Sequence, residues 1–76
     1  MSVDPNISDP DLWLGHVFSA QAVAKGQVIR RQLRDIERYA GWERFAAEVT
    51  RRGFRAVRNR DQIIVFCNND PIRRVV

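Results

Sequence analysis

Few side chains in this sequence could take part in acid–base or covalent chemistry. The chain has one histidine, His16, and one cysteine, Cys67. A catalytic histidine needs a carboxylate to orient it and a nucleophile beside it, and in the sequence only Asp9 and Asp11 come close to His16. Cys67 ends an apolar run, where a free cysteine usually behaves as a small hydrophobic residue. We therefore expect no catalytic residue and no enzymatic activity.

Metal and cofactor chemistry has little support either. A chain with one cysteine cannot form an internal disulfide or a cysteine-rich zinc site. The glycines are isolated and do not form a phosphate-binding loop. The carboxylates of the predicted helices alternate with arginines, so we interpret them as partners in helix ion pairs: Asp35, Glu37, Glu43 and Glu48. We expect no metal and no cofactor.

Arginine gives the strongest chemical signal in the chain. Lys25 is the only lysine among the 13 basic residues. A guanidinium group holds a phosphate or carboxylate through two parallel hydrogen bonds, which an ammonium group cannot do. We predict that two groups bind an anionic partner: Arg51, Arg52, Arg55, Arg58 and Arg60, and, as a second patch, Arg30, Arg31, Arg34 and Arg38. The alternative is a solvated face with local ion pairs.

The hydrophobic pattern predicts the elements that position these arginines. We expect an irregular acidic arm over residues 1–11, because Asp4-Pro5 and Asp9-Pro10 favour turns or extended backbone. Residues 12–76 are expected to form a single compact domain. Its expected elements are a short helix over 19–25 capped by Ser19, a strand over 27–31, helices over 32–40 and 42–52, hairpin strands over 54–58 and 62–67, and an edge strand over 72–76. The predicted fold is α+β, with two main helices packed on a small antiparallel sheet that contains a C-terminal β-hairpin.

The second hairpin strand is apolar on both faces. Its side chains alternate between Ile63, Val65 and Cys67 on one face and Ile64 and Phe66 on the other. Both faces therefore need cover. The helix over 42–52 can cover one face, with Trp42 in its buried stripe. The other face needs the helix over 32–40, the N-terminal apolar segment or a second molecule, so a homodimer is an open alternative.

Charge is distributed unevenly along the chain. Residues 1–24 carry three aspartates and no lysine or arginine, a charge of −3, and the remaining residues carry +7. We interpret the acidic arm as a solvated tail, with folding over the basic face as the alternative. No signal-peptide pattern is visible, and the longest uninterrupted apolar run covers only residues 63–67. We expect a soluble cytoplasmic protein that does not contact a membrane.

The segment around the hairpin resembles a known pattern. Arg52-Gly53-Phe54 and Val57-Arg58 are similar to the small bacterial HicA-type toxins. Those toxins have a double-stranded-RNA-binding-like fold in which a helix, a glycine–aromatic pair, a basic strand and a turn precede a strand with the catalytic histidine. Here Gln62 or Ile63 occupies the histidine position. The resemblance covers under a third of the chain and implies no RNase activity.

The whole chain also resembles very small proteins of bacteria, phages and prophages, a class that includes anti-CRISPR inhibitors. It shares with them the motifs at residues 28–31, 35–38, 52–54 and 65–68. The resemblance implies a non-enzymatic inhibitor that blocks a bacterial defence complex, and it transfers no residue roles. The expected partner is an acidic surface of such a complex or the nucleic acid itself. The alternative function is a small regulatory protein that contacts the backbone of DNA or RNA.

Overall fold

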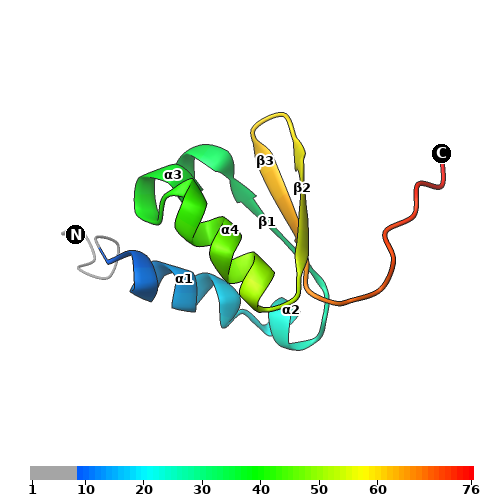
Figure 1. Cartoon of the computed structure of the whole chain (residues 1–76), viewed down its shortest axis with the longest axis horizontal. Coiled ribbons are helices and arrows are strands. Elements are labelled where there is room, and N and C mark those ends of the chain that lie inside the picture. The colour runs from blue at the N-terminus through cyan, green and yellow to red at the C-terminus, as the bar shows by residue number, and fades with distance from the viewer. Residues whose placement is uncertain (1–8) are drawn as a thin grey trace.

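The computed structural model describes residues 9–76, which form four helices and one three-stranded antiparallel sheet (Figure 1). The elements in chain order are α1 (Pro10–Phe18), α2 (Gln21–Ala24), β1 (Val28–Gln32), α3 (Leu33–Tyr39), α4 (Trp42–Arg51), β2 (Arg55–Asn59) and β3 (Gln62–Phe66). The predicted α+β fold, with helices packed on an antiparallel sheet and a C-terminal hairpin, is confirmed.

The strand that comes last in the chain lies in the centre of the sheet, in the order β1-β3-β2. The register aligns residues in rows across the three strands: Ile29, Val65 and Ala56 form one row, Arg30, Ile64 and Val57 the next, and Arg31, Ile63 and Arg58 the third. Successive rows point to opposite faces because side chains alternate along a strand. The rows of Ile63 and Val65 face the helices.

The core lies between that inner face and α1, α3 and α4. Phe45 of α4, Ile36 of α3 and Val17 of α1 are fully buried against Ile63 and Val65, in one apolar cluster. Figure 1 shows these helices on one side of the sheet. Of the three covers considered for the second face, α3 and the N-terminal apolar segment pack with α4 on the first face instead.

The helix α1 begins where the two Asp-Pro pairs predicted an irregular arm. Asp9 is its N-cap, and Oδ1 of Asp9 accepts hydrogen bonds from the N–H groups of Asp11 at 2.9 Å and Leu12 at 3.4 Å. Pro10 occupies the first turn, where a missing N–H costs nothing. The arm therefore ends by residue 9, and the rest of it, residues 1–8, lies outside the described residues. Ser19 closes α1 and does not cap α2.

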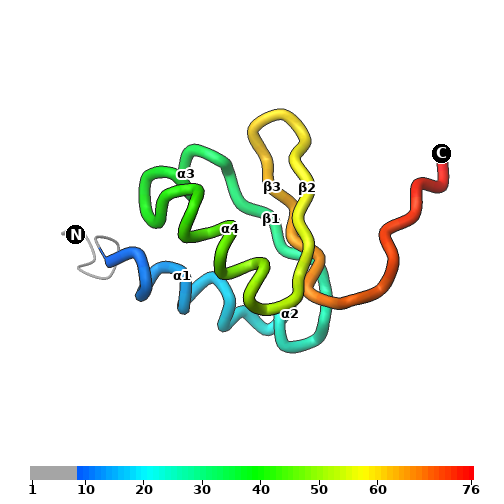
Figure 2. The backbone as a smooth tube through the Cα atoms, viewed as in Figure 1, coloured from blue at the N-terminus to red at the C-terminus, as the bar shows by residue number. Residues whose placement is uncertain are grey.

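The chain leaves the sheet after β3, as Figure 2 shows. The predicted edge strand over residues 72–76 is wrong, because this segment pairs with neither edge of the sheet. Asn68 begins a turn by accepting from the N–H of Asp70 at 2.9 Å, and its amide donates to the carbonyl of Gly26 at 2.8 Å. Pro71, which has no N–H to donate, then directs the chain away. Within residues 9–76, no helix is both long and apolar enough to cross a membrane.

Candidate anion-binding site

The β2–β3 hairpin turns at Arg60 and Asp61, next to the start of α3. The N–H of Leu33 donates to the carbonyl of Asp61 at 2.7 Å, which ties the hairpin turn to the first turn of α3. Arg60 has φ 55°, the one left-handed residue other than glycine among residues 9–76. This conformation is disfavoured for a residue with a Cβ. Strain of this kind clusters at functional sites, and a positive φ is also what a two-residue hairpin turn requires.

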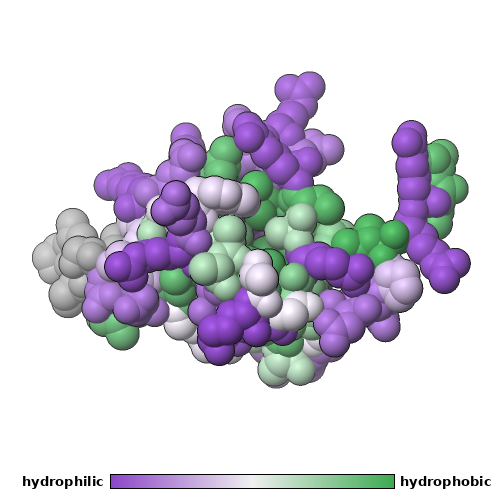
Figure 3. All heavy atoms as spheres, viewed as in Figure 1, coloured by the Kyte–Doolittle hydropathy of each residue, from purple (hydrophilic) through white to green (hydrophobic). Residues whose placement is uncertain are grey.

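Arginines from both predicted groups meet at this end of the sheet. Arg31 on β1 and Arg58 on β2 lie opposite Ile63 from its two sides, on the inner face. Arg30 lies one residue earlier on the outer face, opposite Ile64. Together with Arg34 in the first turn of α3 and Arg60 in the turn, they form a set that we call the hairpin-end arginines: Arg30, Arg31, Arg34, Arg58 and Arg60. Figure 3 shows hydrophilic side chains crowded around the hairpin end.

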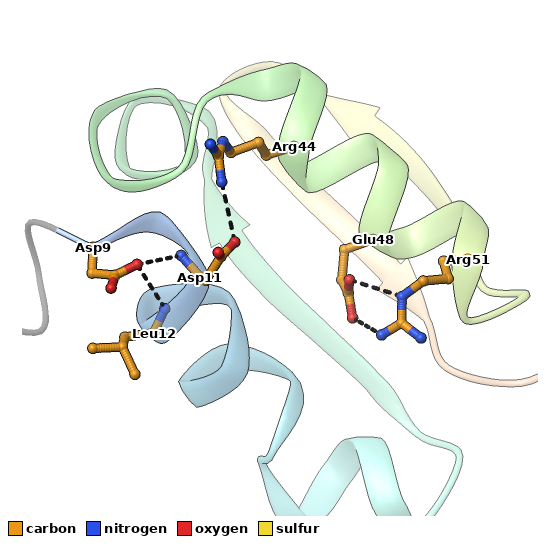
Figure 4. A network of polar contacts seen from close by, with 6 residues as sticks. All are labelled: Asp9, Asp11, Leu12, Arg44, Glu48 and Arg51. Atoms are coloured by element: carbon orange, nitrogen blue, oxygen red, sulfur yellow. Dashed lines mark hydrogen bonds and ion pairs between the residues drawn. The ribbon is translucent and has the colours of Figure 1, made fainter.

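Arg51 and Arg52 lie elsewhere, at the C-terminal end of α4. Both bind Glu48, at 2.5 Å from Arg51 Nη2 and 2.5 Å from Arg52 Nε (the Arg51 pair is shown in Figure 4). The hydrogen bond from Arg51, with that from Arg52, holds the pKa of Glu48 below its usual value. Arg52 also lies over the ring of Phe18, 4.8 Å from its centroid. The ion-pair interpretation, offered as the alternative to binding, therefore holds for these two arginines.

The remaining predicted binding residues are separate from both sets. Arg55, at the start of β2, donates to the backbone carbonyl of Asp70. Arg38, near the end of α3, lies 5.4 Å from the centroid of the Tyr39 ring. The nine predicted arginines thus differ in location and in the groups that they contact. The order of residues along the chain did not show this division.

The ion pairs decide which arginines keep an uncompensated charge. Within residues 9–76, the paired arginines are Arg51 and Arg52 with Glu48, and Arg44 with Asp11 at 3.1 Å (Figure 4). The pair from Arg44 joins α4 to α1 and escaped the sequence pattern because its partners are far apart in the chain. In the described part of the chain, no carboxylate pairs with a hairpin-end arginine.

The helix ion pairs expected for Asp35, Glu37 and Glu43 do not form within the described residues. Holding two long, solvated side chains in one geometry costs as much entropy as a screened surface pair returns. Among residues 9–76, Arg34 and Arg38 therefore have no ionic contact. The expectation of ion pairs holds only for Glu48.

The arrangement suits holding an anion without transferring a proton, because guanidinium groups stay charged at every pH that proteins tolerate. His16 is exposed on α1. Cys67 is 4% exposed, and burial raises the pKa of its thiol. Among residues 9–76, no group of three histidine, cysteine or acidic side chains is placed to hold a metal ion.

A groove between α4 and β2 adjoins the hairpin-end arginines. It consists of two cavities of about 400 and about 300 Å³ that share Trp42 and Ala56. Arg58 lines the larger cavity. The expectation that Trp42 is buried is wrong, because the residue is 44% exposed. All five residues of β2 are exposed, whereas β1 and β3 each carry buried residues.

A scan against protein-family models, and searches of curated proteins and of solved structures, found no match to this chain. The case for a function therefore depends on the residues described above. They place five arginines that have no carboxylate partner among residues 9–76 at one end of an open sheet, beside an apolar groove.

Proposed function

We propose that this chain is a non-enzymatic binding protein, a phage-type inhibitor in the manner of the anti-CRISPR proteins. It places the hairpin-end arginines on an acidic surface of a bacterial complex that handles nucleic acid. The observation that carries the proposal is the difference between the two sets of arginines. Those of α4 have carboxylate partners, whereas within residues 9–76 those of the hairpin end have none.

Two physical features of the hairpin end support a binding partner there. Like charges held close together repel, and an anionic surface would remove that repulsion on binding. Arg60 also occupies a position where glycine would avoid the cost of a left-handed conformation. An arginine at that position contributes a guanidinium group at the tip of the hairpin in exchange for lower stability.

The neighbouring apolar surface favours a protein partner. Trp42 is 44% exposed and lies with Arg58 in the wall of the larger cavity, and Val57, on the outer face of β2, is 43% exposed. Tryptophan and arginine contribute disproportionately to protein–protein binding energy. Aliphatic side chains such as that of Val57 have no complementary group on a phosphate backbone. The proposed site of action is the bacterial cytoplasm, where such complexes act.

Direct nucleic-acid binding is the second candidate, and one row of the sheet favours it. Gln32, Gln62 and Asn59 lie in register across the three strands at the hairpin end. Amide side chains beside arginines commonly contact phosphates and sugars. In this candidate the protein follows the backbone without reading sequence, and its affinity falls steeply with salt.

Binding measurements separate the two candidates. The intact protein is titrated into labelled double- and single-stranded DNA and RNA at about 50 and 200 mM salt, the range over which phosphate contacts weaken. Micromolar binding that collapses at the higher salt would support the second candidate. Absence of nucleic-acid binding, together with capture of a defence complex by the intact protein, would support the first.

Variants make the test specific to the site. Replacing Arg58 and Arg60 by glutamate is expected to abolish binding, whereas the same replacements at Arg73 and Arg74 change the net charge equally and are expected to preserve it. Arg73 and Arg74 lie in the C-terminal segment, beyond the sheet. Equal binding by both variants, or binding to none of these targets, would contradict the proposed function.

A further inference from the structure

The outer edge of β2 is unpaired. β2 lies at the edge of the sheet and pairs only with β3. In an antiparallel pair, every second residue directs its N–H and C=O groups away from its partner strand. In the described part of the chain, no other segment hydrogen-bonds to these groups. A free edge of this kind can receive a further strand.

The groove lies where such a strand would place its side chains. An added strand runs about 4.8 Å from β2, and its alternate side chains point toward the side of α4. The two cavities lie along β2 on either side of Trp42. Side chains two residues apart are about 6.6 Å apart along a strand, so consecutive inward side chains would fall on the two sides of Trp42. Figure 3 shows apolar side chains in this region, below the hydrophilic hairpin end.

The charge of β2 indicates which kind of strand fits. Arg55 lies on the outer face, Arg58 on the inner face and Arg60 just beyond the strand. A second copy paired along this edge would bring two such sets of arginines together, and like charges on neighbouring strands are destabilising. A strand with acidic side chains would instead be attracted on both faces.

We propose that an extended acidic segment of the partner protein adds to the free edge of β2 as a fourth strand. Two of its inward side chains are apolar and enter the groove beside Trp42, an inward carboxylate at the hairpin end meets Arg58, and the outward carboxylates meet Arg55. This inference rests on the proposed function, because it names the part of the partner that the arginine-rich surface holds. Five or six residues suffice, since the five residues of β2 span about 17 Å.

The test uses a synthetic six-residue peptide with both ends blocked, in which the side chains of one face are two valines and a terminal glutamate and those of the other face are all glutamate. Binding to the intact protein is measured by titration calorimetry at low salt. Two control peptides are used: one has lysine in place of glutamate, and the other is N-methylated at alternate residues, so that one edge cannot donate hydrogen bonds. We expect the acidic peptide to bind, the lysine peptide not to bind, and N-methylation to weaken binding at least about tenfold, as the loss of two or three backbone hydrogen bonds implies.

Protein variants complete the test. Replacing Arg55 and Arg58 by glutamine is expected to weaken peptide binding by about tenfold or more, whereas the same change at Arg73 and Arg74 leaves it unaltered. Equal affinity for the methylated and unmethylated acidic peptides would overturn strand addition and leave the arginine surface standing. Absence of peptide binding by a protein that still captures a defence complex would do the same. Absence of binding to peptide, nucleic acid and complex alike would overturn both proposals.

Discussion

Replacing an arginine at the end of α4 should lower the stability of the fold, whereas replacing hairpin-end arginines should weaken binding. Arg52 is replaced by glutamine in one variant, and Arg58 and Arg60 are both replaced by glutamine in the other. Glutamine keeps much of the arginine side-chain length and has a similar helix propensity. The first variant loses contacts within the fold, and the second loses charges that, within residues 9–76, have no carboxylate partner.

The expected magnitude follows from the contacts of Arg52. Its pair with Glu48, at 2.5 Å across one helical turn, contributes about 0.3–0.5 kcal/mol at a surface position. Its position 4.8 Å from the centroid of the Phe18 ring contributes about 0.5–1 kcal/mol. Losing both costs about 1 kcal/mol, which lowers the Tm of a domain this small by about 4–8 °C. The hairpin-end variant should stay within about 0.5 kcal/mol of the wild-type protein.

Thermal unfolding followed by circular dichroism measures the first effect, and peptide or nucleic-acid titration measures the second. We expect the Arg52 variant to unfold at a lower temperature and to bind normally. The hairpin-end variant should unfold near the wild-type temperature and bind weakly. If the hairpin-end variant loses as much stability as the Arg52 variant, its arginines are structural, and the distinction drawn from the ion pairs is refuted.

Three further predictions follow from single residues. Replacing Arg60 by glycine should raise Tm by about 4–8 °C, because it removes a left-handed penalty of about 1 kcal/mol, and should weaken binding; an unchanged Tm would show that φ 55° is not strained. The lowered pKa of Glu48 means that its carboxyl group loses a proton more readily in the folded protein than in the unfolded chain. The ionised carboxylate therefore contributes fully to the free energy of unfolding above the usual glutamate pKa, and this contribution is lost as pH falls through the lowered pKa. The Tm difference between the wild-type protein and Glu48→Gln should therefore shrink in acid, and a constant difference would count against the ion pairs. Cys67, with a raised pKa and little exposure, should resist a thiol reagent at neutral pH until denaturant is added; rapid labelling of the native protein would contradict its burial.

Local signals in the sequence predicted most of the elements. The helix α4 follows from the apolar spacing of Phe45 and Val49, and it ends before Gly53, whose φ of 75° suits glycine. The hairpin follows from two β-rich runs separated by Arg60 and Asp61. These features depend on residues close together in the chain, which is why the pattern was sufficient to predict them.

The features that sequence reasoning missed depend on long-range packing. The helix α1 was hidden because Asp9-Pro10 is both a turn signal and a helix start, and only the N-cap hydrogen bonds distinguish the two. The exposure of Trp42 depends on how much of β2 the helix covers, which periodicity along α4 does not determine. One signal was present: Ala56 and Arg58 lie at the inward-facing positions of β2, where a covered strand would carry larger apolar residues.

The grouping of the arginines was also beyond local reasoning. Arg31 and Arg58 meet across Ile63 because β1 pairs with β3 and not with β2. The hairpin-end arginines therefore include members of both groups that the sequence predicted. Proximity along the chain joined Arg58 to Arg51, although the fold places them at different ends of the helix–sheet layer.

The most direct test of the binding claim is an NMR titration of the isotope-labelled protein with the acidic peptide, with backbone amide shifts followed residue by residue. We expect the largest shifts at residues 30–34 and 55–62, and small shifts at residues 48–52, where the arginines already pair with Glu48. Shifts centred on the end of α4 would contradict the claim that the hairpin end is the anion-binding surface.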